Sequence, residues 1–279
     1  MKTLINNRWL LLDYFNSTNL EKMNGQIAKY ILENPKLFED HSLIHIGQVS
    51  PFSESTLSRF FSTVCSISFP NFKKNDLEEK KQFQKKINSI LNIRNEFNHI
   101  MNQLNKISDL SISKNDIYWL SHKILSSRKV LILGHSSVLG SSFTLQSLLL
   151  YFNKLVYVPY NYSSQIQLIN EMNESDLIIT HNLSSDWMDS SIVDACKFEL
   201  KDINSSCVSI SISTDSIKSN KQINYSRIIQ LSKKESLLSE SIFSLFYKLV
   251  TIYCFILLSG EEESEDDQEN ISHISNSEI

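Results

Sequence analysis

Residues 130–137 read Val130-Leu-Ile-Leu-Gly-His-Ser-Ser137, and this stretch decides the fold. A run of four apolar residues that stops at a glycine predicts a short buried β-strand. The hydroxyl-rich turn after it leads directly into a helix-length apolar segment over residues 139–152. A strand, a tight turn and a helix in this order are typical of an α/β domain with a parallel sheet.

The same alternation continues toward the C-terminus. Apolar strands separated by helices indicate a doubly wound parallel sheet that is covered on both faces. The further strand-length runs are 156–158, 177–180, 208–212 and 228–231. The further helix-length segments are 164–170, 190–200 and 235–258. We therefore predict a five-stranded α/β domain over residues 112–260.

The N-terminal part has a different pattern. Between residues 20 and 86, apolar side chains recur at three- and four-residue intervals, as at Ile27, Tyr30 and Ile31, and strand signals are nearly absent. This predicts an all-α domain over residues 1–86. Residues 87–111 are polar with a weaker helical period, which is typical of a helical linker.

The segment from His41 to Val64 predicts two short helices joined by a turn. Ser42 and Ser53 are each suited to cap a helix N-terminus, and Pro51 interrupts the chain between them. Gly47 is small enough for close helix packing, and Phe52 is placed to fill the turn. This pattern predicts a helix-turn-helix, in which the N-terminal part of the second helix enters the major groove of DNA.

A family resemblance becomes specific at this point. Ile27-Ala-Lys-Tyr-Ile-Leu-Glu-Asn-Pro35, followed by Ser53-x-x-Thr56-x-x-Arg59-Phe60 and Phe69-x-x-Phe72-Lys73, resembles the N-terminal domain of RpiR-family transcription regulators over about fifty residues. Family members usually have glycine where this chain has Cys65 and Ser68, so the chain is a divergent relative. The resemblance and the lysine run after it imply a set of DNA-binding residues. They are Ser53, Ser55, Thr56, Arg59, Lys73 and Lys74.

The α/β part resembles the sugar isomerase-type (SIS) domain that follows in this family. Two turns after the first and third predicted strands, 134–137 and 181–186, are rich in serine like the phosphosugar pocket of SIS domains. The resemblance implies the flavodoxin-like strand order and a sugar phosphate effector. Neither turn has the full glycine pattern of the family, so a vestigial domain that only dimerises stays open. The implied ligand-binding residues are Gly134, Ser136, Ser137, Thr180, Asn182, Ser184 and Ser185.

Each of these residues also has a simpler interpretation. The lysines between 73 and 86 can form a solvated helix face, and Arg59 can form a structural ion pair. Ser53 can act as a cap alone, and the serines of the two turns can be ordinary turn residues.

The formal net charge of −4 is unevenly distributed. Residues 261–279 contain eight acidic residues and no lysine or arginine, which leaves the rest of the chain at +4. We expect this tail to be disordered and solvated. A second interpretation is that it competes with a polyanion for basic surface.

Neither a membrane span nor a metal site is expected. Asp13 interrupts the apolar run near the N-terminus, so no signal peptide is predicted, and Lys248 lies in the middle of the most apolar stretch, 241–258. The four cysteines lack the spacing of zinc ligands and are typical of reduced thiols. No cofactor motif is present.

The sequence thus predicts a cytoplasmic transcription regulator that binds double-stranded DNA and acts as a homodimer or higher homo-oligomer, without catalytic residues. One alternative is a phosphosugar isomerase that uses His135 or His181 as acid or base. The other is a degenerate family member that works only through dimerisation and protein partners.

Overall fold

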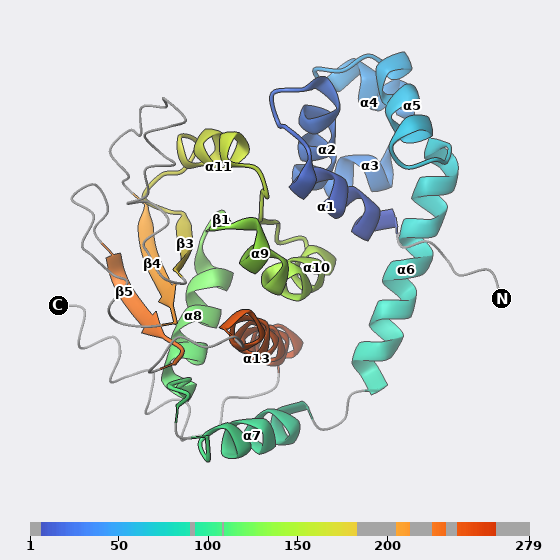
Figure 1. Cartoon of the computed structure of the whole chain (residues 1–279). Helices are drawn as coiled ribbons and strands as arrows, with labels where there is room; N and C mark the ends of the chain where they lie inside the picture. Colours follow the sequence, from blue (N-terminus) through green and yellow to red (C-terminus); the bar gives the residue numbers. More distant parts are fainter. Residues whose placement is uncertain are drawn as a thin grey trace.

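The computed structural model describes residues 7–89, 93–107, 109–182, 205–212, 225–232 and 239–260. Figure 1 shows a group of helices from the N-terminal part beside an α/β part built on one sheet. The predicted helix over 190–200, the acidic tail, Ser184 and Ser185 lie outside the described residues.

The sheet has five parallel strands in the order β2-β1-β3-β4-β5. This confirms the predicted parallel sheet and its flavodoxin-like order. β3 continues to Asn182, two residues beyond the predicted end, so His181 and Asn182 belong to the strand and the predicted turn was placed too early. The strands are β1 (Val130–Leu133), β2 (Val156–Tyr157), β3 (Leu177–Asn182), β4 (Ser206–Ser211) and β5 (Tyr225–Gln230).

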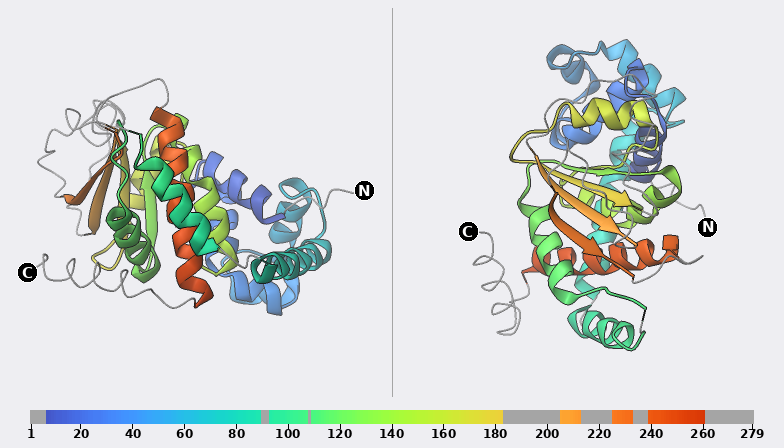
Figure 2. Two further views of the ribbon diagram at one scale, coloured as in Figure 1. Left: turned by 90° about the horizontal axis from the view of Figure 1, so that it is seen from below. Right: turned by 60° about the vertical axis from the view of Figure 1, so that its left-hand side comes forward.

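One face of the sheet packs against α7 (Ile93–Leu104), α8 (Lys114–Ser126) and α13 (Ser239–Ser259). The side chains of Ile132, Ile179 and Ile210 lie in this core. The right-hand view in Figure 2 shows α13 and α7 together on this side. Helix α7 falls in the predicted linker, and its helical pattern is confirmed because Phe97 and Met101 are buried in the same core.

The segment after β1 differs from the single helix predicted over 139–152. It consists of α9 (Ser136–Leu139), a 3-10 turn η1 (Gly140–Ser142) and α10 (Phe143–Tyr151). After β2 follows α11 (Tyr162–Ile169), which Asn161 caps by accepting from the Ser164 N–H at 2.9 Å. Helix therefore begins two residues after Gly134, at the end of β1.

Helix α13 is long and apolar enough to cross a membrane by length and composition, and 56% of its apolar window is buried inside the structure. Its neighbours are α8, α7 and α10. The burial fits the prediction of a core helix.

The N-terminal helices are α1 (Asn7–Ser17), α2 (Met23–Glu33), α3 (Pro35–Asp40), α4 (Leu43–Val49), α5 (Glu54–Thr63) and α6 (Phe69–Ser89). The predicted caps are confirmed: Ser42 accepts from the His45 N–H at 3.3 Å, and Ser53 accepts from the Thr56 N–H at 3.2 Å. The described residues before position 113 form no strand, as predicted for an all-α region.

Helix α1 fastens the helical part to the α/β part. Its Leu12 and Phe15 are fully buried in one core with Leu131, Ile178 and other side chains from the second face of the sheet. The Asn16 and Gln146 side chains exchange two hydrogen bonds, of 2.7 and 3.0 Å. The two parts therefore share a hydrophobic core and pack as one body.

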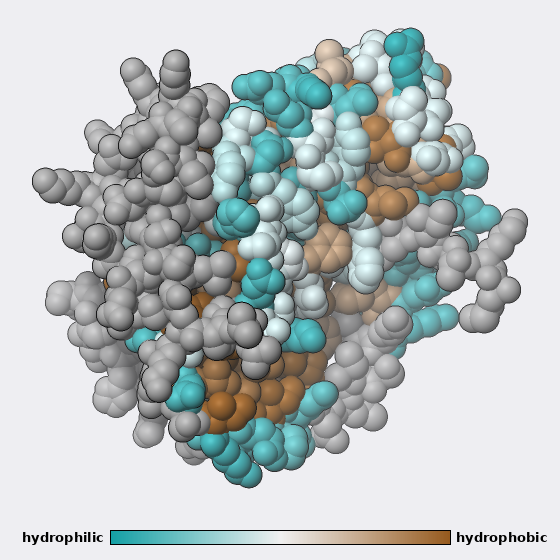
Figure 3. Space-filling view, viewed as in Figure 1, coloured by the Kyte–Doolittle hydropathy of each residue, from teal (hydrophilic) through white to brown (hydrophobic). Residues whose placement is uncertain are grey.

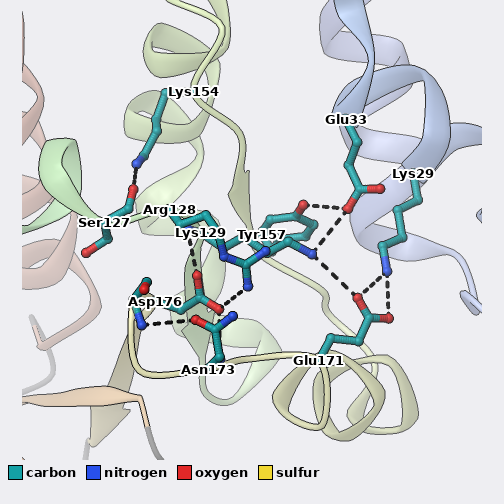
Figure 4. Close-up of polar contacts among 11 residues, drawn as sticks. Lys29, Glu33, Ser127, Arg128, Lys129, Lys154, Tyr157, Glu171, Asn173 and Asp176 are labelled. Atoms are coloured by element: carbon teal, nitrogen blue, oxygen red, sulfur yellow. Dashed lines mark hydrogen bonds and ion pairs between the residues drawn. The ribbon is translucent and has the colours of Figure 1, made fainter.

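Ion pairs join the same two parts at the surface. Lys29 on α2 donates to both carboxylate oxygens of Glu171 at 2.6 and 2.5 Å, and the Tyr157 hydroxyl donates to Glu33 at 2.6 Å. Lys129 lies 3.6 Å from Glu33 and 3.7 Å from Glu171. Figure 4 shows the side chains of Lys29 and Glu33 on α2 pointing toward those of Lys129, Tyr157 and Glu171, which lie just before β1, on β2 and just after α11.

Candidate functional site

The turn between α4 and α5 is closely packed. A Cβ atom at Gly47 would lie 2.8 Å from the Glu54 backbone nitrogen, so only glycine allows this approach of the two helices. The Phe52 ring packs edge-on against Tyr30 at 5.7 Å, and the Ser50 hydroxyl donates to the Phe52 carbonyl at 3.0 Å. The predicted roles of Gly47 and Phe52 in this turn are confirmed.

Helix α5 presents a polar face to solvent. Leu57, Phe60 and Phe61 are buried and hold the helix on the N-terminal core. The exposed side is formed by small hydroxyl groups, one cation and one carboxylate, and its members are Ser53, Glu54, Ser55, Ser58, Arg59, Ser62 and Thr63. A helix that is fixed on one side and polar on the other can insert its free face into a groove of a ligand.

The predicted DNA-binding residues of α5 lie together. The Ser53 hydroxyl is 3.0 Å from the Ser55 hydroxyl and 2.8 Å from that of Thr56. Arg59 is exposed, and no ion pair joins it to another described residue. The alternative interpretation of Arg59 as a structural ion pair therefore finds no support among the described residues.

The predicted lysines lie on α6, apart from the α5 cluster along the chain. Lys73 is half-buried, and its Nζ donates to the His41 carbonyl at 3.2 Å, while Lys74 is exposed. Farther along α6, Lys80 forms an ion pair with Glu39. Lys74 is thus a solvated side chain, whereas Lys73 and Lys80 have intramolecular partners.

A second set of predicted residues lies at the carboxyl edge of the sheet. Leu133 pairs with Thr180, so the ends of β1 and β3 are neighbours at the point where strand order reverses. A Cβ atom at Gly134, which has a φ of 158°, would lie 2.9 Å from the His181 Cβ. The structure therefore brings together the ends of both strands, as predicted.

The backbone of Gly134 already has a partner. Its N–H donates to the Gln165 side-chain oxygen at 3.2 Å, and the Gln165 amide donates to its carbonyl at 3.0 Å. Gln165 is fully buried. The amide that would hold a phosphate in the implied pocket is thus used to anchor α11.

Ser136 and Ser137 are exposed beyond the end of β1. The Ser137 N–H donates to Nδ1 of His135 at 3.4 Å, and the Ser137 hydroxyl lies 3.2 Å from the same nitrogen. Within the described part of this sheet edge, neither lysine nor arginine is present on residues 134–142. An anion bound here would be held by neutral hydroxyl and amide groups.

Thr180 and Asn182 are fully buried on the sheet face opposite His181. Thr180 donates to the Tyr225 hydroxyl at 3.3 Å, and Asn182 donates to the Ser209 hydroxyl at 2.8 Å. The buried Ser211 hydroxyl, next to Asn182 in the sheet register, has no hydrogen-bond partner among the described residues. A polar cluster with one unsatisfied hydroxyl therefore lies inside the carboxyl half of the sheet.

His181 lies on the other face, against α13. Its Nε2 is 2.5 Å from the Tyr247 hydroxyl, and Phe243 packs 4.9 Å away. Burial lowers the pKa of His181 to about 3, so the imidazole is neutral at neutral pH. It is packed in the core and does not lie in an open turn.

Several of these polar residues were not predicted, namely Gln165, Ser209, Ser211 and Tyr225. Serine alternates with Val208 and Ile210 in β4, and this pattern indicates a polar face on a buried strand, because a strand covered on both faces is normally apolar on both. Gln165 carries no such signal, since a single glutamine in a short helix is usually exposed.

No group of three or more histidine, cysteine, aspartate or glutamate side chains is arranged to hold a metal ion among the residues that the structure describes. Cys65, Cys207 and Cys254 are buried free thiols.

No family model matches the chain, and no curated protein matches it. Solved structures similar to it include the NanR protein of Vibrio vulnificus complexed with ManNAc-6P, which is 14% identical, with 96% of this chain and 99% of that chain covered and a TM-score of 0.35. The sugar isomerase domain of an RpiR transcription factor from Sphaerobacter thermophilus is 13% identical, with 67% and 99% covered and a TM-score of 0.42.

The C-terminal domain of glucosamine-fructose-6-phosphate aminotransferase from Francisella tularensis is 10% identical, with 73% of this chain and 50% of that chain covered and a TM-score of 0.38. Similarities at these scores carry no conclusion about fold or function. The fold assignment rests on the strand order and the helix packing described above.

Proposed function

We propose that the chain is a DNA-binding transcription regulator of carbohydrate metabolism, which works in the cytoplasm as a homodimer. The observation that carries the proposal is the outward face of α5, where Ser55 and Arg59 are exposed while Leu57 and Phe60 anchor the helix. Side chains of these types, at the start of the second helix of a tight pair, are suited to base edges and phosphates. The resemblance to the RpiR family in this segment agrees with this role.

In this proposal the α/β domain is an SIS-type sensor for a sugar phosphate or a related metabolite. The exposed hydroxyls of Ser136 and Ser137 are suited to a hydroxylated ligand. Thermal melts of the full chain against a panel of sugar phosphates test this, because a ligand that binds only the folded state raises its stability. A panel in which no compound shifts the melting temperature counts against sensing.

We propose no enzymatic activity for the chain. A general base must reach the proton that it removes, and His181 is buried against Phe243 and Tyr247. His135 is exposed but has Ser137, and no carboxylate, at its Nδ1 among the described residues. This part of the proposal would be overturned if the wild-type chain converted a sugar phosphate and the His135→Ala variant did not.

Fluorescence anisotropy with fragments tiled over the DNA around the protein's own gene tests the regulator proposal. We expect at least one fragment to bind more tightly than the rest, with an affinity that falls as salt rises because phosphate contacts release counterions. Equally weak binding of all fragments, without dependence on salt, would refute DNA-binding regulation.

A further inference from the structure

A cavity of about 450 Å³ lies where α1, α6, α10 and α13 meet. It is separate from the outer face of α5 and from the carboxyl edge of the sheet, because none of the residues assigned to those sites lines it. Its volume is within the range of small-molecule pockets. In the view of Figure 3, hydrophobic side chains also gather on the surface around α13.

Aromatic side chains form much of the cavity wall. Trp9 packs edge-on against Phe143 at 5.9 Å, and Phe83 stacks on Tyr151 at 4.1 Å. Trp9 is 48% exposed at the opening. Aromatic walls of this kind bind apolar bodies and attract cations to their ring faces.

Two buried polar atoms on residues of the cavity wall have no hydrogen-bond partner within the part of the chain that the structure describes. Glu79 is 7% exposed, and its Oε1 accepts from the Asn7 N–H at 2.8 Å, whereas its Oε2 is unsatisfied. Ser147 is also buried, and its hydroxyl is unsatisfied. Both residues line the cavity. Both atoms are covered in this conformation. A buried polar atom without a partner is costly, so a hydrogen-bond donor that reaches either atom from the cavity would stabilise it.

The charges around Glu79 point to a cation. The ion pairs of the neighbouring cluster join Arg8 with Asp76 and Glu39, and Lys80 with Glu39. Two cations thus face two carboxylates. Arg8 and the backbone N–H groups of Asn7 and Arg8 act to lower the pKa of Glu79, but no ion pair joins its carboxylate to another described residue. A buried carboxylate without a counter-charge is strongly stabilised by one.

We propose that this cavity binds a small organic amine with an aromatic or apolar body. The side chains of Glu79 and Ser147 turn toward the cavity when the amine binds, so that its ammonium group donates to Glu79 Oε2 and to the Ser147 hydroxyl. The body of the amine lies between Trp9, Phe83 and Phe143. An ammonium group has three donors and no acceptor, so it matches two acceptor atoms and excludes a carboxylate ligand. Because the cavity is lined by both parts of the chain, the bound amine also stabilises their packing.

Isothermal titration calorimetry of the full chain at pH 8 tests the site with three probes of one shape. They are 2-phenylethylamine, 2-phenylethanol and 3-phenylpropanoate. We expect the amine to bind at least tenfold more tightly than the alcohol, and the carboxylate to bind weakest. Equal affinity for the amine and the carboxylate would overturn the proposal.

Two variants locate the site. Glu79→Gln removes the charge and is expected to weaken amine binding at least tenfold. Glu78→Gln, which changes the preceding residue on α6, is expected to leave amine binding unchanged. Ser147→Ala removes only an unsatisfied hydroxyl and serves if Glu79→Gln does not fold; it is expected to weaken binding several-fold. Wild-type affinity in Ser147→Ala and in a folded Glu79→Gln variant would refute the assignment.

Discussion

At the residue scale, local chemistry made the turn between α4 and α5 predictable. The hydroxyls of Ser42 and Ser53 accept hydrogen bonds from backbone N–H groups in the first turn of the helices that follow them. Every helix N-terminus has such unpaired N–H groups, so a serine at this position is a local signal. Gly134 was predicted to lie in the turn after the first strand, but Gln165 was not predicted as its partner. That contact joins residues far apart in sequence and leaves no local pattern.

Gly47→Ala tests the close approach of α4 and α5. The added Cβ would lie 2.8 Å from a backbone nitrogen that cannot move alone, so we expect a loss of about 1–3 kcal/mol of unfolding free energy. Gly140→Ala is the matched control, because nothing lies within 4 Å of its added Cβ. Urea denaturation of both variants measures the difference, and equal stability would contradict the packing described for this turn.

Glu79 makes stability depend on pH. Burial is the main reason why the pKa of Glu79 is raised from 4.5 to about 6 in the folded chain. Between these values the folded state binds more protons than the unfolded state, so this group's contribution to stability falls as pH rises. A pKa change of this size corresponds to about 2 kcal/mol.

We therefore expect Glu79→Gln to gain stability relative to wild type as pH rises from 4.5 to 6. Thermal melts of both proteins across this range measure the difference, and other titrating groups cancel in the comparison. A difference in melting temperature that stays constant across this pH range would show that the pKa of the Glu79 carboxyl is not raised.

At the element scale, the strands were the most predictable part. Short apolar runs between turns predicted all five strands, because each strand contains at least two consecutive apolar residues. β5 begins at Tyr225, three residues before the run predicted for it. The division of the segment after β1 into α9, η1 and α10 was not predicted, since its apolar pattern is continuous. Helix α1 lies within the all-α domain predicted for residues 1–86, but its own bounds were not predicted.

Arg8 tests what holds α1 in place. It is 5% exposed and binds Asp76 on α6, Glu39 on α3 and the Leu150 carbonyl on α10, with the Asp76 Oδ2 at 2.9 Å. Arg8→Ala leaves the buried Asp76 carboxylate unpaired, whereas Glu39 keeps its ion pair with Lys80, so we expect a loss of about 3–5 kcal/mol of unfolding free energy.

Lys29→Ala is the control for this prediction. It removes the more exposed ion pair with Glu171, for which we expect a loss of less than about 1 kcal/mol. Chemical denaturation of the two variants distinguishes these roles. Similar losses for both would mean that Arg8 is not the main anchor of α1.

At the scale of the whole molecule, the relation between the two parts was beyond sequence reasoning. Composition predicts a boundary at residues 86–87, but Leu12 and Phe15 of the N-terminal part are buried in one core with side chains of the sheet. Which face of a sheet a distant helix covers depends on long-range packing, which periodicity does not record. The same holds for the cavity beside Glu79, because its lining residues come from four helices.

The central claim is that the free face of α5 reads DNA, and Arg59 is the only cation on it. The most direct test is fluorescence anisotropy of wild type, Arg59→Ala and Lys106→Ala on the tightest-binding fragment at fixed salt. Lys106 is an exposed cation just after α7, far from α5 in Figure 1, so it controls for loss of charge. We predict that Arg59→Ala loses about 1–3 kcal/mol of binding free energy and that Lys106→Ala binds like wild type. Equal binding by Arg59→Ala and wild type would contradict the account.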